Sequence, residues 1–363
     1  MTQPRYADPH RIERCRRFWH RAPTDRPLVG VLVERMHPLT HFSTGKSSPE
    51  VLPDDIRVDA FLAECDRRHA ASEATGGDAV FVGYPTIGLP WLAAIMGCPV
   101  RFRGTSAWTE KYPGDWTTYD ARSVAWENGW FDKMTELTRA AVEHGAGHYP
   151  VGPCHLHGVI DVAAAMIGSE ELCLAIYEQP EELGRLLDVI AGAWSHIAHT
   201  QFELLPRYHE GYFNGNQPLW APGRTMFVPA DAVSLLSPTV VEQWVVPRVR
   251  RSVEGLDYSI AHTHSSYLHG LDAFLEVDAL RAVQVGMDTA GPSVADLLPT
   301  LRKIQQQRAL IVAVVVDDPR QAAEDAKTAV RSLAREGLCV LSYLPTAEAG
   351  REFMACLKDE LDL

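Results

Sequence analysis

The chain has 363 residues, of which 46% are hydrophobic and 22% charged, and this balance excludes an intrinsically disordered protein. With 34 Lys and Arg against 47 Asp and Glu, the formal charge is −13, which argues against binding to nucleic acid or to an anionic membrane. The length suits one large domain or two ordinary ones.

Cysteine usage and apolar runs bear on the compartment. The seven cysteines are an odd number and lack the short spacings of a disulfide scaffold or a CxxC zinc knuckle, which favours a reducing environment. The first residues carry no apolar signal-peptide core, and no window approaches the roughly 20 apolar residues that span a bilayer. We therefore expect a soluble, cytoplasmic protein.

Strand-like and helix-like segments alternate along most of the chain. The predicted strands are residues 28–34, 79–82, 149–152, 211–215, 259–264, 282–286, 310–316 and 338–343. The predicted helices are residues 58–75, 131–144, 169–177, 180–205, 239–254, 294–307 and 319–336.

Continuous apolar strands, such as residues 309–316, are typical of parallel sheets covered by helices. Roughly eight such strands predict an α/β protein whose residues 1–363 form one (β/α)8 TIM barrel enlarged by insertions. An open doubly wound sheet is the alternative. It is less favoured because the sequence has neither a GxGxxG fingerprint after the first strand nor a Walker loop.

Residues 84–130 differ in composition from the rest and are predicted to be an insertion within the barrel. They contain five of the nine tryptophans and four prolines. A connection this long usually forms a lid or an oligomer contact. A packed surface loop with its own small tryptophan core is the other interpretation, and a homodimer is the default expectation for such a barrel.

Three segments carry candidate functional residues, because barrel enzymes place their chemistry where strands end. The first follows the strand that ends near residue 152. Its His157 and Asp161 lie one helical turn apart if the helix has begun, so both side chains can face the same opening and act in catalysis. A capping aspartate and a surface histidine are the alternatives.

The second segment is the strand 259–264, where His262 and His264 point to one face at its carboxyl end. Two adjacent imidazoles suit a divalent transition metal, most often zinc. They equally suit catalysis or substrate recognition without a metal, with their pKa values tuned by proximity. Simple packing is the third interpretation.

The third segment, residues 213–231, predicts a substrate-binding loop. Trp220 would supply an apolar wall and Arg224 a bidentate clamp for an anion. Asp231 would bind substrate as a base, or it would only cap a short helix that runs to Leu235.

Two stretches resemble the uroporphyrinogen decarboxylase-like superfamily. One reads Tyr-Pro-Val-Gly-Pro-Cys-His-Leu-His-Gly-Val-Ile-Asp over residues 149–161, with Gly168 and Pro-Glu-Glu from Pro180 after it. The other begins Asp-Ala-Val-Ser-Leu-Leu-Ser-Pro at Asp231 and continues to the strand that carries His262. The resemblance covers about residues 130–345 and implies a (β/α)8 barrel with its active-site cleft at the C-terminal mouth.

The resemblance implies two chemistries: porphyrinogen decarboxylation without a cofactor, and zinc-dependent methyl transfer between a corrinoid and a thiol. The decarboxylases carry an N-terminal Arg-Gln-Ala-Gly-Arg stretch that holds substrate carboxylates. Residues 26–36 read Arg-Pro-Leu-Val-Gly-Val-Leu-Val-Glu-Arg-Met instead, so that clamp is absent and authentic uroporphyrinogen decarboxylase activity is not expected.

In the methyltransferases of this superfamily, zinc is bound by His-x-Cys on one strand and by a cysteine on the last strand. The resemblance therefore implies His262, His264 and Cys339 as metal ligands here, although Cys339 lies about 13 Å along the strand from Tyr343. His157, Asp161, Glu34 and Asp231 are alternative third ligands. Glu34 and Tyr343, at the ends of their strands, are further predicted to bind substrate.

The function predicted from these observations is methyl transfer, dependent on zinc and involving a corrinoid or thiol acceptor. A corrinoid protein is a candidate partner. The enzymatic alternative is a cofactor-free decarboxylase or lyase in which Arg224 anchors a small acid and Asp161 or His157 moves a proton. A third interpretation, from a different class, is a non-catalytic corrinoid or tetrapyrrole binder with the tryptophan-rich insertion around the macrocycle.

Overall fold

The computed structural model describes residues 4–33, 50–85, 88–103 and 106–361. Its centre is a six-stranded parallel sheet with the order β1-β11-β10-β9-β8-β7. The strands are β1 (Leu28–Val33), β7 (Phe227–Val228), β8 (Ser259–His264), β9 (Leu280–Met287), β10 (Ala309–Val314) and β11 (Leu338–Leu344). The predicted strand 259–264 is confirmed to the residue.

Further segments continue the sheet into a ring. The amide of Asp78 donates to the carbonyl of Val29 in β1, and Gly83 forms a parallel bridge with Val151. A side chain on Gly152 would collide with the carbonyl of Phe213 at 2.6 Å, so these two backbones touch. The Asn214 amide donates to Thr225 at 3.2 Å, two residues before β7. The predicted α/β barrel is therefore confirmed.

Three predicted strands are shorter than expected. Residues 79–82 form no strand, and the wall there is marked by the bridge between Gly83, just after them, and Val151. Residues 149–152 contribute only that bridge, and Pro150 and Pro153 lack the amide that a ladder needs. The predicted strand 211–215 is only β5 (Tyr212–Phe213), and it pairs antiparallel with β6 (Trp220–Ala221).

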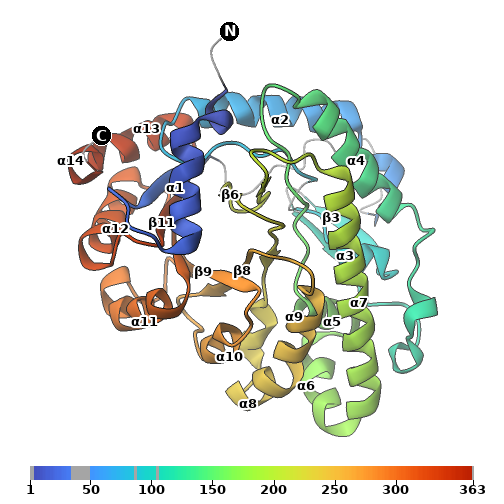
Figure 1. The fold of residues 1–363 in the computed structure, drawn as a ribbon. Coiled ribbons are helices and arrows are strands. Elements are labelled where there is room, and N and C mark those ends of the chain that lie inside the picture. Colours follow the sequence, from blue (N-terminus) through green and yellow to red (C-terminus); the bar gives the residue numbers. More distant parts are fainter. Residues whose placement is uncertain (1–3, 34–49, 86–87, 104–105, 362–363) are drawn as a thin grey trace.

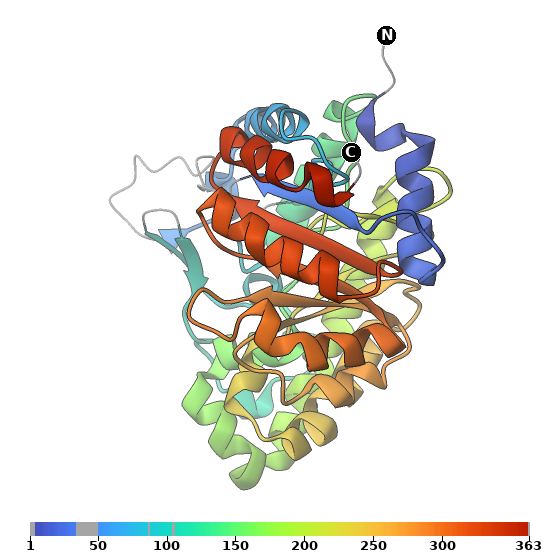
Figure 2. The ribbon, with the colours of Figure 1, turned by 90° about the vertical axis from the view of Figure 1, so that its left-hand side faces the viewer.

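Helices cover the outer side of the sheet, and α12 and α13 lie over β10, β11 and β1 in Figure 2. The longer helices are α1 (Pro9–His20), α2 (Val58–Glu73), α4 (Trp130–His144), α5 (Val159–Ile167), α6 (Ser169–Glu178), α7 (Pro180–Leu204), α11 (Val294–Gln307), α12 (Pro319–Ser332) and α13 (Ala347–Cys356). The shorter ones are α3 (Trp91–Ile95), α8 (Pro238–Val240), α9 (Val246–Ser252), α10 (Leu271–Leu275) and α14 (Lys358–Leu361). Within the described residues, no helix is long and apolar enough to cross a membrane.

Side-chain alternation along the strands separates two cores. On β10, Leu310 and Val312 face outward into the large core beneath the helices, whereas Ile311 faces into the barrel. The interior core includes Ile260 of β8 and Cys339 of β11, which fill the lower layers of the barrel. The same alternation points His262 inward one layer above Ile260 on β8, and Tyr343 inward two layers above Cys339 on β11.

Helix α1 closes the amino-terminal end of the barrel. Its Cys15, Phe18 and Trp19 pack in the same cluster as the barrel interior, and the indole of Trp19 donates to the carbonyl of Trp220 at 2.7 Å. Figure 1 shows α1 lying across the barrel strands. A cavity inside the barrel therefore opens at the carboxyl ends of the strands.

Residues 84–130 contain α3, the strands β3 (Val100–Arg103) and β4 (Ser106–Thr109), and single 3-10 turns at Trp116–Thr118 and Ala121–Ser123. The strands form a small antiparallel sheet with β2 (Glu50–Val51). Trp91 is buried and packs edge-to-face on Trp130 at 6.0 Å between ring centres, as the packed-loop interpretation expects. Trp108 is 43% exposed and faces the barrel mouth, as the lid interpretation expects.

Candidate active site

A cavity of about 590 Å³ opens at the carboxyl ends of the strands. The strands deliver His262 and His264 from β8, Gln284 and Gly286 from β9, and Tyr343 from β11. The loops before α5 and after β7 supply further polar groups, and β4 supplies Trp108. The other polar or aromatic lining residues are Thr109, His155, His157, Asp161, Asn216, Gln217, Phe227 and Asp231.

The two imidazoles of β8 converge on one point. The Nε2 atoms of His262 and His264 lie 3.0 Å apart, and the ring planes are inclined at 67°. Gly286 on the neighbouring strand makes room for them, since a Cβ there would lie 3.4 Å from Cε1 of His262 and 3.6 Å from Nδ1 of His264. A larger residue at 286 would press on both rings.

Each ring is held through its other nitrogen. Nδ1 of His262 bonds to Oε1 of Gln284, and Nδ1 of His264 bonds to Oδ1 of Asp288 at 2.6 Å. Because these oxygens only accept, both Nδ1 atoms carry a proton, and in a neutral ring Nε2 then presents its lone pair. Two lone pairs 3.0 Å apart repel each other unless a cation or a proton lies between them.

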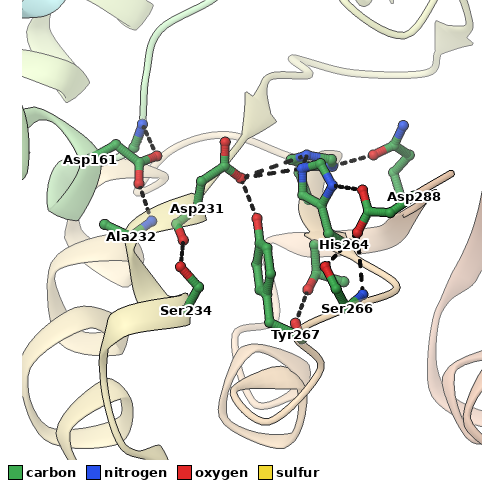
Figure 3. A network of polar contacts seen from close by, with 12 residues as sticks. Asp161, Asp231, Ala232, Ser234, His264, Ser266, Tyr267 and Asp288 are labelled. Atoms are coloured by element: carbon green, nitrogen blue, oxygen red, sulfur yellow. Dashed lines mark hydrogen bonds and ion pairs between the residues drawn. The ribbon is translucent and has the colours of Figure 1, made fainter. Parts of the chain in front are cut away.

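Asp231 brings a carboxylate to the same point, as Figure 3 shows. Its Oδ1 lies 3.7 Å from Nε2 of His262 and 3.7 Å from Nε2 of His264. Tyr267 donates its hydroxyl to that oxygen at 2.7 Å. Asp231 begins a 3-10 turn (Asp231–Leu235) whose N-cap is Ala230, so the expectation that it only caps a helix is wrong. Ligand atoms of Asp231, His262 and His264 all lie within 4.8 Å of one another.

Asp161 lies in the first turn of α5, and in Figure 3 it stands on the side of Asp231 away from His264. Its Oδ2 accepts from the amide of Gly158 at 3.2 Å, so the predicted helix cap is present. Its Oδ1 accepts from the amide of Ala232 at 2.7 Å, which ties α5 to the residue after Asp231. Burial, and then the nearby charge of Asp231, raise the pKa of Asp161 to about 7.

Burial disfavours the charged form of three imidazoles in the cavity, those of His155, His157 and His262. Burial lowers the pKa of His262 to about 4 and also lowers the pKa values of His155 and His157. His157 makes no hydrogen bond to any residue that the structure describes, and its ring packs on His155 at 5.0 Å between ring centres. His157 is therefore free to exchange a proton with a molecule in the cavity.

Three predicted site residues lie elsewhere, and these expectations are corrected. Trp220 is buried at the closed end, where its indole donates to the carbonyl of Tyr208 at 2.6 Å. Arg224 bonds to Nδ1 of His199 at 3.2 Å, outside the cavity lining. Cys339 is fully buried in the lower barrel core and is absent from the metal-ligating group found among the described residues. Glu34 lies outside the described residues.

The structure also brings in residues that the sequence interpretation did not single out, namely Gln284, Asp288, Tyr267, His155 and Trp108, whereas Asn216 and Gln217 of the lining belong to the predicted loop 213–231. Gln284 offered a signal, because it is the single polar side chain in an otherwise apolar strand core. Asp288 follows the end of that strand, the usual place for barrel chemistry. Trp108 belongs to the tryptophan-rich insertion for which a lid was one interpretation, whereas nothing in the sequence marks Tyr267.

Comparison with known proteins supports the fold. No family profile matches the chain, and no curated protein matches it. A methyltransferase from Methanosarcina mazei superposes with a TM-score of 0.70 at 15% identity, covering 97% of this chain and 99% of that one. A B12-independent methionine synthase from Shewanella sp. W3-18-1, in complex with selenomethionine, superposes with a TM-score of 0.53 at 10% identity, covering 93% and 96%.

Fold and site together define a (β/α)8 barrel with a histidine and carboxylate cluster at its mouth. Its structural neighbours include methyltransferase barrels, which is consistent with the superfamily resemblance seen in the sequence. At these identities the likeness establishes the architecture, and the activity has to be argued from the cavity.

Proposed function

We propose that the protein is a metal-dependent methyltransferase whose divalent metal is bound by Asp231, His262 and His264. The observation that carries the proposal is the convergence of the Nε2 atoms of His262 and His264, 3.0 Å apart, on a carboxylate oxygen. A bound divalent cation would offset the repulsion between the lone pairs of two neutral rings in this arrangement. The methyltransferase neighbours make methyl transfer the first reaction to test.

The donor set fits zinc, which binds imidazole nitrogen and carboxylate oxygen and keeps an open position in catalytic sites. It also fits other divalent transition metals that take two histidines and one carboxylate. Gln284 and Asp288 act as the outer partners that fix the tautomer of each metal-binding histidine. Tyr267 holds the carboxylate of Asp231 in its orientation by donating its hydroxyl to Oδ1.

A metal bound there would supply Lewis acidity that favours the deprotonated form of a thiol or hydroxyl group. Neutral imidazoles leave more positive charge at such a site than thiolates would, so we propose an oxygen substrate, such as a methyl ether, as the methyl donor. Its methyl–oxygen bond breaks as the methyl group passes to the sulfur of a thiol, and the oxygen leaves as an alcohol or phenol that takes up the proton of the thiol. His157 would accept the released proton at a ring nitrogen. Asp161 would hold the loop of Asp231 through its bond to Ala232.

A corrinoid and its carrier protein remain candidate co-substrate and partner. The Shewanella neighbour is a B12-independent methionine synthase, so we propose that transfer without a corrinoid be tested alongside transfer from methylcobalamin. The predicted homodimer and the cytoplasmic location stay predictions.

The decisive experiment is metal analysis of the full chain after zinc-supplemented expression, together with a methyl-transfer assay. We expect metal close to one equivalent per chain, and thioether formation from 2-mercaptoethanol with guaiacol or methylcobalamin as donor. A chelator should abolish this transfer, and zinc should restore it. A metal-free protein, or transfer indifferent to the chelator, would contradict the proposal. Carbon dioxide release from small acids in the presence of chelator would favour the decarboxylase instead.

Tyr267 gives a prediction about metal affinity. Asp231 is 56% exposed, and the hydroxyl of Tyr267 is the donor that aims its Oδ1 toward the histidines. Tyr267→Phe is expected to weaken metal binding by roughly 10-fold to 100-fold. Competition with a metal indicator dye measures the change. Tyr258→Phe, at the closed end beside Trp19, is the control and should leave affinity unchanged.

A further inference from the structure

His155 is another imidazole of the cavity, and the ring of Phe227 separates it from the proposed metal ligands Asp231, His262 and His264. Its ring centre lies 5.7 Å from that of Phe227, which in turn lies 5.1 Å from that of His262. On its other side the ring packs against His157. His155 is only 7% exposed, so its orientation is fixed by packing and by one hydrogen bond.

A chain of amides holds the backbone of Asn216, whose side chain makes that bond. Thr225 receives the Asn214 amide at 3.2 Å, and Oδ1 of Asn214 accepts from the backbone amide of Asn216 at 3.1 Å. The side-chain nitrogen of Asn216 then meets Nδ1 of His155 at 2.9 Å. Because an amide nitrogen only donates, Nδ1 accepts and the ring proton lies on Nε2.

The Nε2–H group is available to a ligand. His155 lines the cavity, and its Nε2 is not among the buried unpartnered atoms of the described residues, so it opens onto the cavity. Burial keeps the ring neutral by holding its pKa well below the ordinary value. The protein therefore presents a fixed, uncharged hydrogen-bond donor that its own residues leave unused.

We propose that His155 orients the substrate by donating from Nε2 to an uncharged oxygen, such as a carbonyl, ether or hydroxyl oxygen. The inference rests on the proposed function in one respect only, namely that this cavity binds the substrate. The carboxylate of Asp231 lines the same cavity and opposes an anionic group there. A neutral donor beside an apolar ring matches a neutral acceptor, and the fixed tautomer excludes a ligand that offers only a donor.

The tautomer is measured first, by 15N NMR of the full chain with labelled histidine. Wild type is expected to show His155 protonated at Nε2. Asn216→Asp replaces the donor with a carboxylate that only accepts, so the proton should move to Nδ1. Binding is then measured with two probes of the same shape, acetophenone, which carries a carbonyl oxygen, and α-methylstyrene, which carries none.

Wild type should prefer acetophenone by roughly threefold to tenfold, the net effect of one hydrogen bond. The preference should vanish in Asn216→Asp and in His155→Leu and persist in His155→Gln, whose amide still donates. Protonation of wild-type His155 at Nδ1, equal affinity for the two probes in wild type, or an unchanged preference in His155→Leu would overturn the proposal. Both readouts are independent of metal content and turnover, so failure of the proposed methyl transfer is recognised separately.

Discussion

Replacing His262 or His264 with alanine is expected to remove the metal and the methyl-transfer activity together. Each substitution deletes one of the two Nε2 donors and leaves a site with one nitrogen and one carboxylate oxygen. Loss of an outer partner costs roughly 10-fold to 100-fold in affinity, and loss of a direct ligand should exceed that range. Metal content by mass spectrometry and the initial rate of methyl transfer check the result.

Two controls separate ligand loss from general damage. Cys339→Ala tests the cysteine that the superfamily resemblance implied, and it should retain metal because Cys339 lies in the lower barrel core. His10→Ala removes an exposed imidazole of α1 and should change neither metal content nor rate. Loss of metal in Cys339→Ala, with retention in His262→Ala, would move the site to a different place in the barrel.

Asp231→Asn gives a graded version of the same test. The amide keeps the shape and can still accept from Tyr267, but it carries no charge toward the histidines. Metal affinity should fall while the fold and the melting temperature stay close to wild type, because Asp231 is more than half exposed.

The strand that carries His262 was predictable as a short segment that follows a helix-like stretch, and successive side chains along any strand alternate between its two faces. Because Ile260 packs in the barrel interior, His262 and His264, two and four residues further along the strand, point to the same side. The pairing of these rings with Asp231 was only one of several alternatives. It depends on how the loop after β7 folds back over α5, and that is set by the Asp161–Ala232 bond.

Trp220 and Arg224 show why loop residues were placed wrongly. The segment after residue 211 was expected to run as one strand to the barrel mouth. Instead Oδ1 of Asn214 accepts the amides of Asn216 and Gln217, which forms a turn. The chain then returns as β6 toward α1, so Trp220 faces the closed end. Such a turn depends on side-chain contacts that hydrophobic periodicity does not report.

Asp78 is expected to be the most important charged residue for stability. It is 2% exposed and accepts bonds from Arg26 at 2.6 Å, from Arg14 at 2.9 Å and from the amide of Val29 at 3.0 Å. Asp78→Asn would leave two largely buried guanidinium groups without their shared counter-ion. The free energy of unfolding should fall by about 3 kcal/mol, as measured by urea denaturation. Glu73→Gln, which removes a partly exposed partner of Arg5, should cost less than about 1 kcal/mol.

The same carboxylate predicts how stability depends on pH. Burial alone would raise the pKa of Asp78, but the hydrogen bonds and charge of Arg26, together with the charge of Arg14, outweigh burial and lower it. A carboxyl group with a lowered pKa in the folded state contributes its stability above the ordinary aspartate value of about 4 and loses it as the pH falls further. Wild type should therefore lose stability in acid more steeply than Asp78→Asn. Parallel curves for the two proteins would show that the ion pair contributes no net stability and that the variant is weakened by its altered packing alone.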